Sequence, residues 1–86
     1  MAYNIFYNRQ SRKTLLKMPK EIANSIREKL DEISIDPHRK RDDVKPLKGR
    51  PGFRLRIGAW RVIYKLESQK LEILVIKIAS RGDVYK

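Results

Sequence analysis

The sequence predicts an α+β domain with an antiparallel β-sheet, because strand-like and helix-like patterns follow one another in a fixed order along its 86 residues. A short stretch of strand formers comes first, followed by two stretches with helical spacing of apolar residues and three with strand-like alternation. The resulting order is β-α-α-β-β-β. The two helices are expected to form a hairpin that packs on one face of the sheet. Because no long linker interrupts the chain, we expect a single domain spanning residues 1–86.

The first strand and both helices are expected in the N-terminal half. Residues 3–7 (YNIFY) favour a short strand. Asn8 is suited to cap a first helix that runs to about Met18, and Pro19 suits the first turn of a second helix. The apolar residues of the second helix form one stripe: Ile22, Ile26, Leu30 and Ile33. The pair Asp-Pro at 36–37 is expected to end this helix.

The C-terminal half is expected to supply an exposed loop and three strands. Residues 38–52 contain two prolines, two glycines and many charges, which favours a loop. Strands are predicted over residues 53–57, 60–66 and 71–79. A turn at Ser68-Gln69 would pair Lys65 with Glu72 and Ile63 with Leu74 in the last hairpin.

The first of the two hairpins gathers arginines on one face. Gly58-Ala59 suits a type II′ turn, which places Ile57 opposite Trp60 and Arg56 opposite Arg61. Side chains alternate between the two faces of a strand, so one face receives a set of apolar residues and is expected to contact the helices: Leu55, Ile57, Trp60, Val62 and Tyr64. The other face receives Arg54, Arg56 and Arg61 with the more apolar Ile63, and Arg81 follows the last strand at the same edge.

Guanidinium groups placed opposite one another repel, so their crowding calls for an explanation. Each guanidinium is a planar fork that binds phosphate oxygens in pairs, and bound phosphate would relieve the repulsion. The arrangement therefore predicts a phosphodiester site. Solvated arginines on an outer sheet face, or a non-catalytic nucleic-acid binder, would produce the same pattern of residues.

The overall charge also indicates a polyanionic or acidic partner. The chain has 21 Lys and Arg against 10 Asp and Glu, a net charge of +11. Residues 9–20 contain five positive charges and no acid, and residues 38–56 contain eight Lys or Arg against two Asp. The sequence has no cysteine, no apolar run long enough to span a bilayer and no signal-peptide pattern, which favours a cytoplasmic protein without disulfides or thiolate metal sites.

Other polar and aromatic residues are better explained by structure than by chemistry. His38, the only histidine, is expected in a solvated loop, and Trp60 and Tyr64 are expected in the core because of their parity in the hairpin. Lys45, Lys48 and Arg50 lie in the charged loop and are expected to contact a nucleic-acid backbone without sequence preference, the alternative being that they are simply solvated. No metal site or cofactor is predicted.

The ordered set of these motifs resembles the RelE/ParE toxin superfamily, and particularly its RelE branch. The resemblance is found in LKGRPGFRLRIGAWRVIY (47–64), in the hydrophobic strand that follows and in the ending SRGDVYK (80–86). It implies a toxin of a type II toxin–antitoxin system that cleaves mRNA in the ribosomal A site. It also implies an acidic, RelB-like antitoxin as partner, in a hetero-oligomer with the toxin, and the ribosome with its mRNA as target.

The resemblance also assigns roles to individual residues. In the implied reaction the 2′-hydroxyl of the RNA attacks the adjacent phosphate without a metal, and a 2′,3′-cyclic phosphate forms. Arg61 would hold the scissile phosphate, Arg81 would lie near the leaving oxygen, and Tyr85 would orient or deprotonate the attacking hydroxyl or stack on a base. Arg54 and Arg56 would bind the RNA and stabilise its negative charge rather than transfer protons.

Arg54 and Arg56 also mark a departure from the superfamily, because well-known relatives have lysines there. Arginine scarcely ever gives up its proton in proteins, whereas lysine can do so when buried among cations. Acid–base help contributes about 10²–10⁴ in rate, so the implied nuclease would be a slow one. Two other functions fit the sequence: a ParE-like inhibitor of gyrase, and a module that binds RNA or the ribosome without cleaving.

Overall fold

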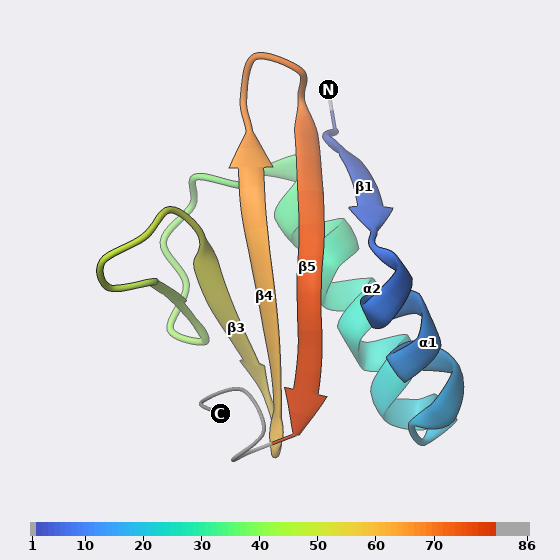
Figure 1. Cartoon of the computed structure of the whole chain (residues 1–86). Coiled ribbons are helices and arrows are strands. Elements are labelled where there is room, and N and C mark those ends of the chain that lie inside the picture. Colours follow the sequence, from blue (N-terminus) through green and yellow to red (C-terminus); the bar gives the residue numbers. More distant parts are fainter. Residues whose placement is uncertain (1, 81–86) are drawn as a thin grey trace.

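In the computed structural model, which describes residues 2–80, a five-stranded sheet has both helices on one side (Figure 1). The elements are β1 (Asn4–Tyr7), α1 (Arg9–Lys17), α2 (Lys20–Ile35), β2 (Val44–Pro46), β3 (Phe53–Ile57), β4 (Trp60–Glu67) and β5 (Glu72–Ser80). The strands lie in the order β1-β5-β4-β3-β2. The predicted α+β class and element order are confirmed. The sheet is mostly antiparallel, and β1 is parallel to β5.

The helices begin and end near the predicted residues. The Asn8 side chain accepts a hydrogen bond from the Ser11 backbone N–H at 2.9 Å, so Asn8 caps α1 as expected. Pro19 directly precedes α2, where its carbonyl accepts from the N–H groups of Ile22 and Ala23. Neither helix of the described chain is both long and apolar enough to cross a membrane.

The first hairpin forms with the predicted register. Ile57 lies opposite Trp60, Arg56 opposite Arg61 and Leu55 opposite Val62. Gly58 has a φ of 57°, a left-handed value that glycine adopts without strain, as a type II′ turn requires at its first central position. The chain therefore places the arginines and the core residues of this hairpin on opposite faces.

The core lies between the helices and the hairpin face that was predicted to contact them. Leu55, Val62 and Tyr64 are fully buried there against the helix residues Ile26, Leu30 and Ile33. The partly buried Ile57 and Trp60 pack on the same cluster. The apolar seat for the helix hairpin is confirmed.

Two predictions about the C-terminal half are wrong. The expected loop over residues 38–52 contains the short strand β2, which pairs antiparallel with β3 and places Lys45 beside Arg54. The last hairpin pairs Lys65 with Leu74, not with Glu72. Its turn has four residues, 68–71, because Leu71 adopts a left-handed φ of 55° and its N–H bonds to the Ser68 carbonyl.

A β-bulge also changes the register of β4 and β5. Ile63 pairs with Lys77 but Tyr64 pairs with Val75, so Ile76 has no partner in the ladder. The Ile76 carbonyl instead accepts a hydrogen bond from the Asn8 side-chain amide at 2.7 Å. The bulge is therefore joined to the beginning of α1.

Candidate functional site

The face of the sheet opposite the helices gathers most of the basic residues predicted as functional. Strand pairing places Arg56 directly opposite Arg61, and Arg54 between Lys45 on β2 and Ile63 on β4. We call the surface formed by Lys45, Arg54, Arg56 and Arg61 the arginine face. Four cations on three neighbouring strands can contact one polyanion together.

Arg61 is the buried member of the arginine face. Only 7% of its surface is exposed, although arginine is among the residues least often buried. Its Nε is buried and has no hydrogen-bond partner within residues 2–80. A buried donor without a partner costs about 1–3 kcal/mol, so the position of Arg61 lowers the stability of the fold and leaves an N–H donor available to a ligand.

Arg56 and Arg61 share a hollow at the hairpin turn. The hollow has a volume of about 390 Å³ and is lined by these two arginines together with Gly58 and Ala59. Arg56 is exposed, whereas Arg61 lies beneath the surface. An anion in the hollow would meet an exposed guanidinium, that of Arg56, and a buried one, that of Arg61.

The predicted loop cations border a second and larger hollow beside the arginine face. It has a volume of about 780 Å³ and is lined by Lys45, Lys48, Arg50 and Arg54 with Pro46 and Leu47. A small hollow of about 90 Å³ shares residues with both and is lined by Lys45, Arg54 and Arg56 together with Asp42 and Asp43. The structure thus brings six of the predicted site residues into three adjoining hollows, the smallest of which also contains two aspartates.

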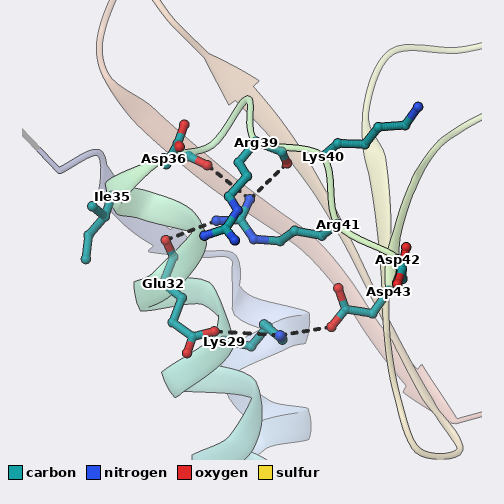
Figure 2. A pocket seen from close by; sticks show the side chains of 9 residues that line it. All are labelled: Lys29, Glu32, Ile35, Asp36, Arg39, Lys40, Arg41, Asp42 and Asp43. Atoms are coloured by element: carbon teal, nitrogen blue, oxygen red, sulfur yellow. Dashed lines mark hydrogen bonds and ion pairs between the residues drawn. The ribbon is translucent and has the colours of Figure 1, made fainter.

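Lys29 and Asp43 form an ion pair that holds the segment before β2 against α2, next to the arginine face. The Asp43 carboxylate lies 3.0 Å from the Lys29 Nζ on α2, and the Asp43 carbonyl accepts from the Arg56 backbone N–H at 2.8 Å (Figure 2). The hydrogen bond to Asp43 raises the pKa of Lys29, so its ammonium stays charged. The residues are 14 positions apart, and no sequence pattern would have paired them.

Arg41 anchors the segment that leads into β2. Its guanidinium donates to the carbonyls of Asp36 at 3.0 Å, Arg39 at 3.1 Å and Glu32 at 3.4 Å, at the C-terminal end of α2 (Figure 2). A cation at this end of a helix also meets the negative end of the helix dipole. Arg41 is therefore used within the fold.

The aromatic residues and the histidine lie where the sequence placed them. Tyr64 is 1% exposed, and burial raises its pKa to about 12, so its hydroxyl keeps its proton. Its ring stacks on Phe53 at a centroid distance of 5.5 Å. His38 is exposed and meets the edge of the Tyr3 ring at 6.5 Å, away from the arginine face.

Two predicted site residues, Arg81 and Tyr85, lie outside the described residues. Within residues 2–80, no three metal-ligating side chains come together. The described part of the site is thus a basic surface around one buried arginine, which can bind phosphate and stabilise negative charge on it.

Comparison with known proteins gives a consistent result for sequence and fold. A family model described as the ParE toxin of type II toxin–antitoxin system, parDE, matches residues 5–85. No curated protein sequence matches the chain at a significant level.

Several solved structures share the fold over nearly the whole chain. A RelE–RelB complex from Pyrococcus horikoshii OT3 is 30% identical with a TM-score of 0.81, and the match covers 96% of this chain and 99% of that one. The isolated RelE toxin of E. coli is 21% identical with a TM-score of 0.80, over 98% and 92% of the two chains. The RelBE2 toxin–antitoxin complex of Mycobacterium tuberculosis is 23% identical with a TM-score of 0.78, over 94% and 100%.

Proposed function

This chain belongs to the ParE toxin family of type II toxin–antitoxin systems, within the RelE/ParE superfamily, and from that premise we propose that it is a ribosome-dependent mRNA endonuclease. The observation that supports this choice is the buried Arg61, whose Nε has no partner in the described part of the chain and which borders a hollow with Arg56. A structural arginine would be expected to have its donors satisfied. This one is prepared for a ligand with phosphate oxygens.

The proposed reaction is attack of a ribose 2′-hydroxyl on the adjacent phosphate. The 2′-oxygen forms a bond to phosphorus and loses its proton, the bond from phosphorus to the 5′-oxygen breaks, and that oxygen gains a proton. The products are a 2′,3′-cyclic phosphate and a 5′-hydroxyl. Negative charge rises on the phosphorane, and a preorganised, desolvated guanidinium stabilises such charge more than water does.

Each arginine takes a role that suits its exposure. Arg61 holds the scissile phosphate and neutralises the phosphorane, and the exposed Arg56 closes on the same group from the rim. Arg54 and Lys45 bind the next phosphate along the chain. Arg81 and Tyr85, which lie outside the described residues, are proposed to assist at the leaving oxygen and the attacking hydroxyl.

The proposed partner is an acidic antitoxin. The similar structures from Pyrococcus horikoshii and Mycobacterium tuberculosis are complexes of a toxin with its antitoxin. The net charge of +11 and the arginine face favour an acidic segment that covers the basic hollows and prevents RNA from entering. Co-purification with the product of the neighbouring gene tests this partner.

The nuclease is tested by primer extension on ribosomes programmed with a defined message. We expect cuts in the A site by the wild-type chain, and a cleavage rate about 10²–10³ lower for Arg61→Ala, as is typical when one charge-stabilising donor is removed. Arg61→Lys should retain part of the activity, because it keeps the charge and loses the fork. Arg9→Ala, an exposed arginine on α1, is the control. Full cleavage by Arg61→Ala would refute the proposal.

Inhibition of gyrase is the second candidate, because the matching family model is that of the ParE toxin. The two functions differ in their first effect in cells. Loss of protein synthesis on induction supports the nuclease, whereas gyrase-dependent breaks in plasmid DNA with continued translation support the ParE-like activity.

A further inference from the structure

A separate pocket lies at the edge of the sheet beside β2, and of its lining the proposed cleavage uses only Lys45. Its apolar part is formed by Pro37, Val44, Pro46 and Phe53, and its volume is about 370 Å³. We call it the β2-edge pocket. This volume lies in the range of about 300–1,000 Å³ that is usual for sites that bind small molecules or single groups.

Packing and proline rings restrict the apolar part of the pocket. The Phe53 ring is fixed by its stack on the buried Tyr64, with an angle of 23° between the ring planes. Pro37 and Pro46 have fixed backbone geometry, and Pro46 belongs to β2. A flat group that enters would meet a preformed aromatic and aliphatic surface. Its binding would therefore cost little conformational entropy in the protein.

The rim of the pocket is basic. Arg39, Lys40 and Lys45 are exposed there, and His38 lies beside them. Arg41 also lines the pocket, but its donors bind backbone carbonyls. Figure 2 shows the Lys40 side chain extending away from the Arg41 cluster. Within the described chain, no carboxylate lines this pocket, whereas the neighbouring hollow at the end of α2 includes Glu32 and three aspartates.

The β2-edge pocket adjoins the arginine face through one shared residue, Lys45. Lys45 lines the pocket and also both hollows that contain Arg54. Phe53 and Arg56 are three residues apart on β3, about 10 Å along the strand, and their side chains leave opposite faces of the sheet, so the β2 edge lies between them. A single RNA strand on the arginine face can therefore pass over the β2 edge and reach the pocket.

We propose that the β2-edge pocket binds a base of single-stranded RNA, next to the nucleotides held on the arginine face. The base stacks on the Phe53 side of the pocket, and the cations at the rim hold the adjacent phosphate. An apolar, aromatic interior with a purely basic rim suits a nucleotide, which joins a flat base to an anion. The inference rests on the proposed function and adds a base-binding subsite to it.

The test uses the full chain and a short RNA that is 2′-O-methylated throughout, so that it lacks the attacking hydroxyl and is not cleaved. Affinity is measured by fluorescence anisotropy at low salt. Phe53→Leu keeps an apolar group and removes the ring, and we expect the affinity to fall about fivefold or more. Lys40→Gln, at an exposed position that does not threaten folding, should lower affinity and reduce the salt slope by about 0.7. Lys70→Gln, an exposed cation in the β4–β5 turn, is the matched control.

Chemical-shift mapping by NMR with the same RNA separates the outcomes. Shifts of the Val44 methyls and the Phe53 ring together with the arginine face support the subsite. Shifts confined to Arg56 and Arg61, with wild-type affinity for both pocket variants, would overturn the subsite and leave the nuclease standing. Absence of any RNA binding would overturn the subsite, whereas the nuclease is decided separately by primer extension on programmed ribosomes. Shifts at Val44 and Phe53 caused by the antitoxin and not by RNA would assign the pocket to a protein ligand instead.

Discussion

Arg56 and Arg61 face each other on neighbouring strands, and their interaction opposes folding unless an anion lies between them. The hairpin parity predicted this pair correctly, because a two-residue turn at Gly58-Ala59 determines every position that follows. The sequence did not predict that Arg61 is buried. Burial depends on packing across the whole sheet, and arginines in an alternating strand pattern normally face solvent.

Removal of one charge of this pair should stabilise the isolated protein. For Arg56→Gln we expect the free energy of unfolding in urea to rise by up to about 0.5 kcal/mol at low salt. The gain should shrink in high salt, since ions screen the repulsion at the exposed Arg56. Lys70→Gln is the control, because Lys70 is an exposed cation in the β4–β5 turn, away from this pair. An equal gain in both variants would show that net charge, and not this pair, opposes folding.

Tyr64 should give the folded protein a stability that depends on alkaline pH. Burial raises the pKa of Tyr64 from 10.0 to about 12, so between these values the folded state holds a proton that the unfolded state has lost. The contribution of Tyr64 to the free energy of unfolding is therefore fully present below pH 10 and is lost as the pH rises through 12. For this difference in pKa between the folded and unfolded states the loss is about 3 kcal/mol. In Tyr64→Phe this part of the decline should be absent. Denaturant unfolding at several pH values measures it, and identical profiles would contradict the assignment.

At the scale of elements, α1 and the bulge of β5 depend on one another. The Gln10 side chain bonds to both the N–H and the carbonyl of Ile78, and Asn8 bonds to the unpaired Ile76 carbonyl. Helix positions were predictable from local signals such as the cap and the apolar stripe. The bulge was not predictable from such signals, because Asn8, which bonds to it, is 68 residues away from Ile76 in the chain. The short strand β2 was missed for a similar reason, since only its pairing with β3 makes it a strand.

Substitution of Asn8 separates its two roles. Asn8→Ala removes both the cap of α1 and the bond to Ile76, and we expect a loss of about 1–2 kcal/mol in the free energy of unfolding. Asn8→Asp keeps an acceptor for the Ser11 N–H and loses the donor to the sheet, so it should lose less. Equal losses in urea unfolding would show that the bond to the bulge, and not the cap, determines the stability at this position.

At the scale of the whole molecule, basic residues occupy two separate surfaces. The arginine face and its loop cations lie on one side of the sheet, whereas Arg9, Arg12 and Lys13 are exposed on α1, which belongs to the helix layer on the other side. The composition predicted a polyanionic partner but not the surface that binds it, because a total charge does not show where on the molecule the charges lie. The hollows and the buried Arg61 favour the arginine face.

The salt dependence of RNA binding tests whether the RNA binds to the arginine face or to α1. Each phosphate of a single strand that a cation neutralises contributes a slope of about −0.7 to the plot of log affinity against log salt. For a double substitution of Lys48→Ala and Arg50→Ala, on the proposed surface, we expect the slope to become shallower by about 1.4. Arg9→Ala with Arg12→Ala removes the same charge from α1 and should leave the slope unchanged, although the net charge falls equally. If both double variants change the slope alike, the RNA responds to the overall charge of +11, and no single face of this protein directs it.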